Sequence, residues 1–429
     1  MARPTEVSSS SLMRPGSVKY LMPLAVLSGA AVLIAHTGRI PYPGSSGLGD
    51  YLRYVAMAQH PFSNEVAARL APFCWRILVP LTVYVLPLPT LTGFWVTTLF
   101  GLGLAACAVM WLLDGLGMSS TTVVAGGVAF ALFGPITFVG LWDYLIVDAV
   151  ACALLTLAIA AAVRRRGMLL VAFLALGALT KETIVFAALF AVIWAIEHRD
   201  RRMLGFACAG SVAAAAILVG LRAAIHPAQE YSLPLFVADN VNMLERNPQL
   251  AAALAIGCFW GAWGLLAPFI TAQFVPQAGS RHYRAITYTL LASASQLLIA
   301  ADERNIGMVF PVAIAAAALT IEELASRTNL SVTLFWAPII AVNAWLGIPF
   351  AMGADPPVAP NGPAQWVASL LIAGVSVLVL VWLAVRQARQ GWSRLIWGGS
   401  VRLAGDRAES RTVGSDHPRS DAGPVSGEK

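Results

Sequence analysis

The chain has 429 residues, of which 58% are hydrophobic and only 12% are charged, whereas soluble globular proteins carry roughly 25% charged residues. With a mean hydropathy of +0.72, this composition predicts a polytopic helical membrane protein and excludes a soluble enzyme, a secreted disulfide scaffold and a disordered chain. The formal charge of +6 falls in short loops and tails, where the positive-inside rule accounts for it without nucleic-acid binding.

The apolar pattern predicts an all-α fold of about ten full membrane spans. A cytoplasmic segment 1–17 precedes a transmembrane domain over 18–390, and a basic, disordered cytoplasmic tail follows over 391–429. We expect the first apolar run to remain as an uncleaved helix. The predicted spans are 18–36, 91–113, 119–140, 144–163, 203–225, 250–272, 286–301, 306–320, 331–350 and 365–386.

The stretch from Met168 to Ile196 does not fit this pattern. It is too short for two full crossings, and a single helix of its length would measure roughly 43 Å. Arginines 164–166 precede it, and Arg199, Arg201 and Arg202 follow it. If both clusters are cytoplasmic, the stretch is a broken hairpin of two short helices meeting near 180–182. Such a break is tolerated only where protein or a water-filled cavity surrounds it.

The positions of lysine and arginine predict the orientation of the chain. With both termini in the cytoplasm, most of the 28 basic residues lie on the cytoplasmic side, as the positive-inside rule requires. Two long segments, 37–90 and 226–249, are then external. The Ala-rich, Lys-poor composition favours the inner (plasma) membrane of a bacterium.

The first external segment holds a predicted short helix, Gly49–Ala58, lying on the membrane surface. Asp50 stands at its start, which suits either a helix N-cap or a catalytic or metal-binding carboxylate. Tyr51 and Tyr54 share one face of this helix, and Arg53 lies between them.

The next part of this segment, Ala71 to Pro89, contains too many prolines and too few residues for a full span, so we expect it to be interfacial. Arg76 there has two readings: its side chain extends to the headgroups, or it binds substrate.

Acidic residues are expected at the outer end of the fourth span. Asp143 and Asp148 open it, and Asp148 lies about one turn deeper, where a carboxylate should face a polar cavity or a partner. Asp302, Glu303 and Arg304 form either a tight polar turn or a phosphate site between two later spans.

Two charged residues, Lys181 and Glu182, stand at the break of the hairpin. Either they cap the two half-helices and neutralise each other, or Lys181 binds an anionic group in the cavity.

All these candidates lie on the external side of the predicted topology. Acids for proton chemistry and cations for an anion at the lipid interface suit an enzyme with a membrane-bound phosphate substrate. The predicted catalytic residues are Asp50 and Asp148, and the predicted substrate-binding residues are Tyr51, Arg53, Tyr54, Arg76, Asp143, Lys181, Glu182, Glu303 and Arg304.

The layout resembles the glycosyltransferase C superfamily, membrane enzymes whose donors are polyprenyl-phosphate sugars. The resemblance rests on Asp50 with its tyrosines, the Pro72–Pro80 segment with Arg76, the acids at 143–148, and the later Lys181–Thr183 and Glu303–Arg304 segments. The arrangement of predicted spans and loops is similar over residues 20–390, but the motifs that match are short.

This resemblance implies transfer of a sugar, with inversion, to a lipid, glycan or protein acceptor on the external face. Asp50 would be the general base or would orient a metal or the acceptor, and Arg304 or Lys181 would hold the donor phosphate. Family members often carry a second carboxylate beside the first, but Gly49 and Tyr51 flank Asp50 here. A divalent metal therefore stays an open question.

Two other classes of function remain open from the sequence. A transporter or flippase of a lipid-linked or small anionic substrate would place ionisable residues near the middle of several spans. A non-catalytic membrane assembly subunit would leave the external acids merely solvated.

Overall fold

The computed structural model describes residues 18–36, 51–61, 63, 69–132, 134–228, 232–246, 266–274, 283–296 and 307–351. The chain divides into two compact units, Met1–Val379 and Leu380–Lys429. All described residues belong to the first unit. The predicted segment 1–17, span 365–386 and tail 391–429 lie outside them.

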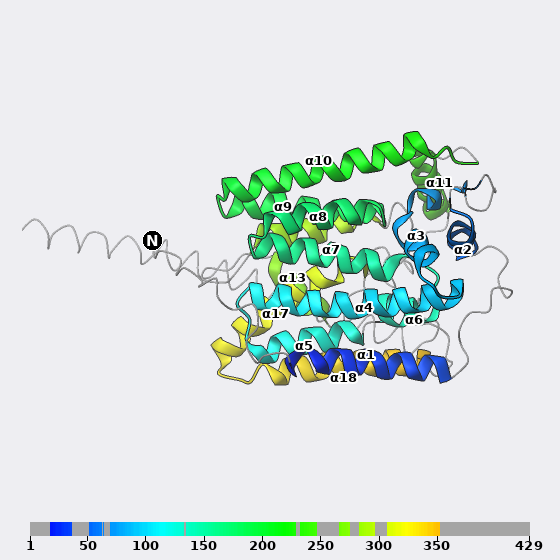
Figure 1. Cartoon of the computed structure of the whole chain (residues 1–429). Coiled ribbons are helices and arrows are strands. Elements are labelled where there is room, and N and C mark those ends of the chain that lie inside the picture. Colours follow the sequence, from blue (N-terminus) through cyan, green and yellow to red (C-terminus); the bar gives the residue numbers. More distant parts are fainter. Residues whose placement is uncertain are drawn as a thin grey trace, which may run out of the picture. The chain divides into compact units, whose positions relative to one another are not determined.

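Every regular element among the described residues is helical, which confirms the predicted all-α class (Figure 1). The helices are α1 Val18–His36, α2 Tyr51–Gln59, α3 Leu78–Val85, α4 Thr90–Gly115, α5 Ser120–Ala131, α6 Val139–Trp142, α7 Asp148–Val163, α8 Gly167–Ala178, α9 Val185–Glu197, α10 Arg201–Ala224, α11 Leu233–Arg246, α13 Ala267–Thr271, α14 Arg284–Ser293, α17 Phe310–Thr328 and α18 Thr333–Ala351. Shorter turns are η2 Phe73–Trp75, η3 Gly134–Phe138, η4 Glu182–Ile184 and η6 Ala272–Phe274.

Two of the described helices, α4 and α10, are each long and apolar enough to cross a membrane, judged by length and composition alone. They differ in their surroundings. In the most apolar window of α4 61% of the residues are buried, against 17% in α10. The helix α4 is therefore a core element, whereas α10 exposes most of its apolar surface.

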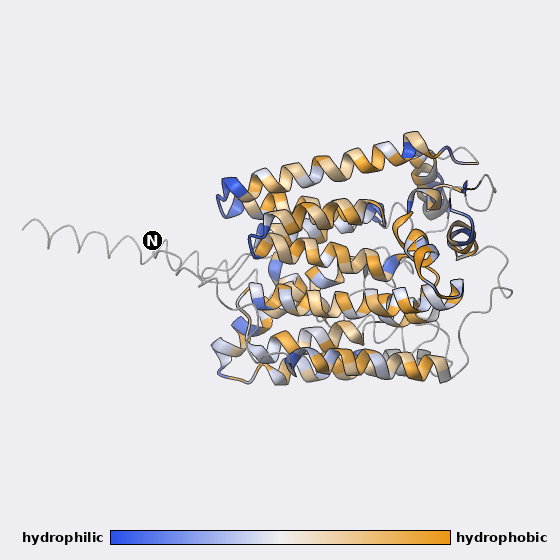
Figure 2. Ribbon diagram, viewed as in Figure 1, coloured by the Kyte–Doolittle hydropathy of each residue, from blue (hydrophilic) through white to orange (hydrophobic). Residues whose placement is uncertain are grey.

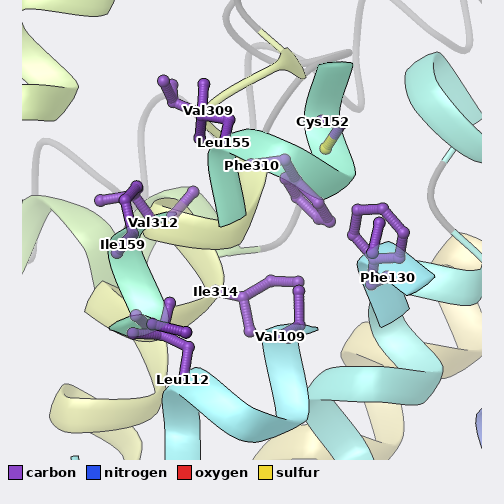
Figure 3. Packing of buried hydrophobic residues seen from close by; sticks show 14 of the residues in the cluster. Val109, Leu112, Phe130, Cys152, Leu155, Ile159, Val309, Phe310, Val312 and Ile314 are labelled. Carbon is purple, nitrogen blue, oxygen red and sulfur yellow. The ribbon is translucent and has the colours of Figure 1, made fainter. Parts of the chain in front are cut away.

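The core lies where α4, α5, α7 and α17 meet. Alanine fills much of α7, and small side chains allow helices to approach closely. Large side chains then pack from several helices, and the rings of Phe130 and Phe310 lie 6.5 Å apart. Figure 3 shows Val109 and Leu112 of α4, Leu155 and Ile159 of α7, and Phe310 and Ile314 of α17 in this cluster.

The predicted span 119–140 is not one helix. Its residues form α5, the turn η3 and α6, because Gly134 and Pro135 interrupt the regular backbone. The next helix starts at Asp148, whereas the predicted span starts at 144.

Other predicted spans correspond to helices with shifted bounds. The predicted span 306–320 corresponds to α17, which begins at Phe310 and continues to Thr328, and the span 331–350 corresponds to α18, which begins at Thr333. Within the described part of span 250–272, which begins at residue 266, the chain forms α13 and the start of η6, and α14 covers the start of span 286–301. The described part of segment 226–249, which the sequence predicts to be external, contains the helix α11, where no helix was predicted.

The broken hairpin is confirmed. The helices α8 and α9 have 12 and 13 residues, and η4 joins them. Helices α7 to α10 thus alternate in direction, so that their ends gather in two groups (Figure 1). We call the group with η4, the start of α7 and the end of α10 the loop end. The group with arginines 164–166 and with Arg199, Arg201 and Arg202 is the arginine end, where Figure 2 shows strongly hydrophilic residues.

Candidate functional site

The helix α2 matches the helix predicted over 49–58, and it packs on η2 through aromatic contacts. Tyr54 is 1% exposed, and its ring meets that of Phe73 edge-on with centroids 5.7 Å apart. The Cζ atom of Arg53 lies 4.3 Å from the centroid of the same ring. Phe73 therefore holds two neighbouring residues of α2 against the segment that carries Arg76.

Arg76 connects α2 to the hairpin turn. Its Nη1 donates to the Tyr54 hydroxyl at 3.1 Å, and its Nε and Nη2 both lie 3.1 Å from Oε2 of Glu182. The Arg76 side chain is 15% exposed. The guanidinium of Arg76 is therefore held by two protein groups, and both its position at the headgroups and its contact with a substrate stay predictions.

The charges of this pair stabilise each other. Burial disfavours the charged form of the Glu182 carboxyl, but Arg76, together with a backbone hydrogen bond and Lys181, outweighs burial and holds the pKa of Glu182 below its usual value. Burial likewise opposes the Arg76 charge, but Glu182 and Tyr54 raise the pKa of Arg76 above its usual value. Both groups are ionised at neutral pH.

Lys181 and Glu182 do not neutralise each other by direct pairing. Lys181 Nζ lies 2.7 Å from Oδ1 of Asp148, the first residue of α7, while Glu182 pairs with Arg76. The Lys181 and Asp148 side chains are only 7% and 9% exposed. The expectation that Asp148 faces a partner is thereby confirmed, and adjacent residues of the turn reach two different elements.

Backbone contacts hold the turn in place. Leu78 N–H, at the start of α3, donates to the carbonyl of Leu179 at 3.0 Å, and the N–H groups of Thr180 and Lys181 both donate to the carbonyl of Gly177. Thr180 is fully buried. Protein thus surrounds the break, as expected for non-helical backbone between apolar helices.

A pocket of about 210 Å³ lies beside this cluster, between α2, α3 and the end of α10. Met57, Ile77, Pro80 and Leu81 give it apolar walls. The segment that carries Arg76 lines the pocket through Ile77, which directly follows it. An apolar cavity next to fixed charges suits an amphipathic ligand.

Three contacts join segment 69–76 to the end of α10 beside the pocket. The Arg69 guanidinium donates to the His226 carbonyl from Nε at 2.9 Å and from Nη2 at 2.6 Å. Trp75 Nε1 donates to the Ile225 carbonyl at 3.1 Å, and Arg222 lies over the Trp75 ring at 5.0 Å. The first predicted external segment is therefore fastened to the last turn of α10.

The remaining predicted site residues fall elsewhere or outside the described residues. Asp143 caps the end of α6, and a turn separates it from Asp148, so the two acids do not open one helix as expected. Asp50, Glu303 and Arg304 lie outside the described residues, and of Tyr51 only the backbone is described.

Sequence reasoning missed Phe73 and Arg69, which organise the cluster and the pocket. The aromatic run Phe73-Cys74-Trp75 beside Arg76 was the available signal, because arginines pack on aromatic faces.

No three His, Cys, Asp or Glu side chains gather as a metal-binding group within the described ranges. Asp148 and Glu182 each face a cation instead, so these described carboxylates do not make up a metal-ligand set.

Comparisons with known proteins give no family: no family model matches the chain, and neither a curated protein nor a solved structure does.

Proposed function

We propose that this chain is a polytopic membrane glycosyltransferase that transfers a sugar, with inversion, from a polyprenyl-phosphate donor to an acceptor on the external face. The charge network at the loop end, in which Lys181–Asp148 is buried and Arg76–Glu182 is partly buried, supports this proposal. Arg76–Glu182 and Lys181–Asp148 join segments more than 30 residues apart in the sequence. Ionisable residues cost free energy among apolar helices, and where they occur they mark functional sites.

The loop end is assigned to the external face. The opposite ends of α7–α10 carry arginines 164–166 and Arg199, Arg201 and Arg202 at two short turns, and short basic turns stay in the cytoplasm. The remaining predicted spans are part of this proposal, in addition to α4 and α10.

The donor would bind with its phosphate near Arg53 and Lys181 and its first isoprenoid units in the apolar pocket. Arg53 packs on Phe73, and no acidic side chain of the described residues pairs with it, so its charge is available for a phosphate. Lys181 and Arg76 keep fixed positions through Asp148 and Glu182. Fixed cations stabilise the negative charge that develops on a leaving phosphate.

In the transfer step the acceptor oxygen attacks the anomeric carbon, and the bond from this carbon to the phosphate oxygen breaks. The phosphate leaves with the electron pair, and Asp50 takes the acceptor proton. Asp148 is the less suitable base because Lys181 occupies its Oδ1. We assign Asp148 the positioning of Lys181.

The test uses purified protein in lipid with a panel of radiolabelled polyprenyl-phosphate sugars. Wild type should consume a donor, and Asp50→Asn should lower the rate about a hundredfold or more. Asp239→Asn, on the exposed surface of α11, is the matched control and should keep the wild-type rate. Consumption unchanged in Asp50→Asn would move the base elsewhere. Vectorial flux of lipid or anion without a new covalent product would instead identify a transporter.

A further inference from the structure

The two turns at the arginine end share one backbone design. In the α7–α8 turn Arg165 has a positive φ of 56°, and in the α9–α10 turn Arg199 has a positive φ of 53°. In both turns the next residue donates its N–H to the carbonyl five positions earlier. The residue that takes this left-handed conformation at a helix end is usually glycine, which has no Cβ. Arginine therefore stands in both turns at a conformational cost.

A pocket of about 580 Å³ lies between these turns, and Arg165, Arg166 and Arg202 line it together with Asp200. Arg165 Nε lies 3.4 Å from Oδ2 of Asp200, whose other carboxylate oxygen caps α10 by accepting from Met203 N–H at 2.9 Å. No acidic side chain of the described ranges pairs with Arg166 or Arg202, and both are exposed. The pocket thus holds more positive than negative charge and favours an anion.

The same pocket has an apolar wall. Met168 and Leu169 line it with exposed fractions of 73% and 43%. Phe206 of α10 packs directly against Gly167, where an added Cβ would lie 2.1 Å from Phe206 Cδ2. Phe206 belongs to α10, in whose most apolar window only 17% of the residues are buried. A free phosphate ion would leave this wall without a partner.

We propose that this pocket binds the headgroup phosphate of an anionic phospholipid. Arg165, Arg166 and Arg202 would surround the phosphate, and an acyl chain would lie along Met168 and Leu169. Basic pockets between helices at the cytoplasmic side suit such headgroups. The inference rests on the proposed membrane embedding and is independent of sugar transfer.

Native mass spectrometry of the detergent-solubilised full chain tests this proposal with phosphatidylglycerol, phosphatidylethanolamine and inorganic phosphate as probes. The test variant is Arg166→Gln/Arg202→Gln, which leaves the Arg165–Asp200 pair intact. The control is Arg199→Gln/Arg201→Gln, which removes the same charge from exposed residues outside the pocket. Unfolding temperatures of both variants show whether they fold.

Wild type and the control should retain phosphatidylglycerol in preference to phosphatidylethanolamine. The test variant should lose about thirtyfold in affinity for phosphatidylglycerol, since each arginine contributes roughly fivefold. Equal losses in both variants would overturn the proposal in favour of general charge attraction. Displacement of the lipid by millimolar inorganic phosphate would overturn the lipid assignment. Because no sugar donor is present, either result leaves the proposed transferase activity untouched.

Discussion

Lys181 Nζ and Asp148 Oδ1 lie 2.7 Å apart between the hairpin turn and the first residue of α7, with both side chains almost fully buried. A buried ion pair costs desolvation on both sides, and removal of one partner leaves an uncompensated charge. The pair therefore fixes the turn to α7 and makes both residues sensitive to substitution.

Lys181→Met should lower the free energy of unfolding by about 3–5 kcal/mol, because Asp148 would remain buried without Lys181. Thermal unfolding in detergent measures the change. The double variant Lys181→Met/Asp148→Leu should regain most of this stability without regaining sugar transfer. Lys19→Met is the control, because Lys19 pairs with Asp114 at a more exposed position and should cost only about 0–1 kcal/mol. A double variant as unstable as the single one would contradict the assignment.

Arg76→Lys should reduce stability by about 1–3 kcal/mol and transfer by up to about a hundredfold. An ammonium cannot reproduce the planar fork that reaches Glu182 and Tyr54 together. Unfolding temperature and the rate of donor consumption measure the two effects. Arg246→Lys is the matched control, since Arg246 is exposed at the end of α11. Comparable effects of the two substitutions would mean that the fork has no special role.

The Arg76–Glu182 pair should contribute stability that depends on pH. The pKa of Glu182 is lower in the folded chain than its usual value of 4.5. Such a carboxyl contributes stability above its unfolded pKa and loses it as the pH falls through the folded pKa. The unfolding temperature of wild type should therefore exceed that of Glu182→Gln by a constant amount above about pH 6 and by less as the pH falls below about 4. A difference that stays constant down to about pH 3 would contradict the ionised pair.

Gly177→Ala should disturb the turn directly. A Cβ on Gly177 would lie 2.4 Å from Cδ1 and 2.5 Å from Cγ1 of Ile184, so either the Ile184 side chain or the approach of α8 to η4 must shift. We expect a loss of about 1–3 kcal/mol and slower transfer, because Lys181 and Glu182 would move with the turn. Gly205→Ala in α10 meets no atom within 4 Å and should leave both unfolding temperature and transfer near wild type. A neutral Gly177→Ala would show that the turn can relax.

The sequence alone predicted the helices that are marked by a long apolar run or by flanking charges. Apolar runs predicted α1, α4 and α10 closely, and the arginines around 168–196 predicted the broken hairpin. These signals are local, because a run of apolar residues or a cluster of arginines needs no tertiary partner to be recognised. The interruption of 119–140 was also marked, by Gly134 and Pro135, but hydropathy outweighed it in the prediction.

The pairings in the site could not be predicted, because they depend on how helices far apart in sequence pack. Lys181 and Glu182 are adjacent, and from the sequence their mutual neutralisation was one of two open alternatives. Their side chains instead reach α7 and the segment after η2, which only the packed helices bring within range. The location of Tyr54 beside Arg76 depends on the same packing.

The single guanidinium of Arg76 also has a mechanical consequence. Tyr54 on α2 and Glu182 at the hairpin turn are both bonded to one rigid, planar group. Neither element can move far from the other while these bonds persist. An anion that drew Arg76 towards itself would break its hydrogen bonds to Tyr54 and Glu182 together. Binding at this one residue would then free both α2 and the hairpin turn to move.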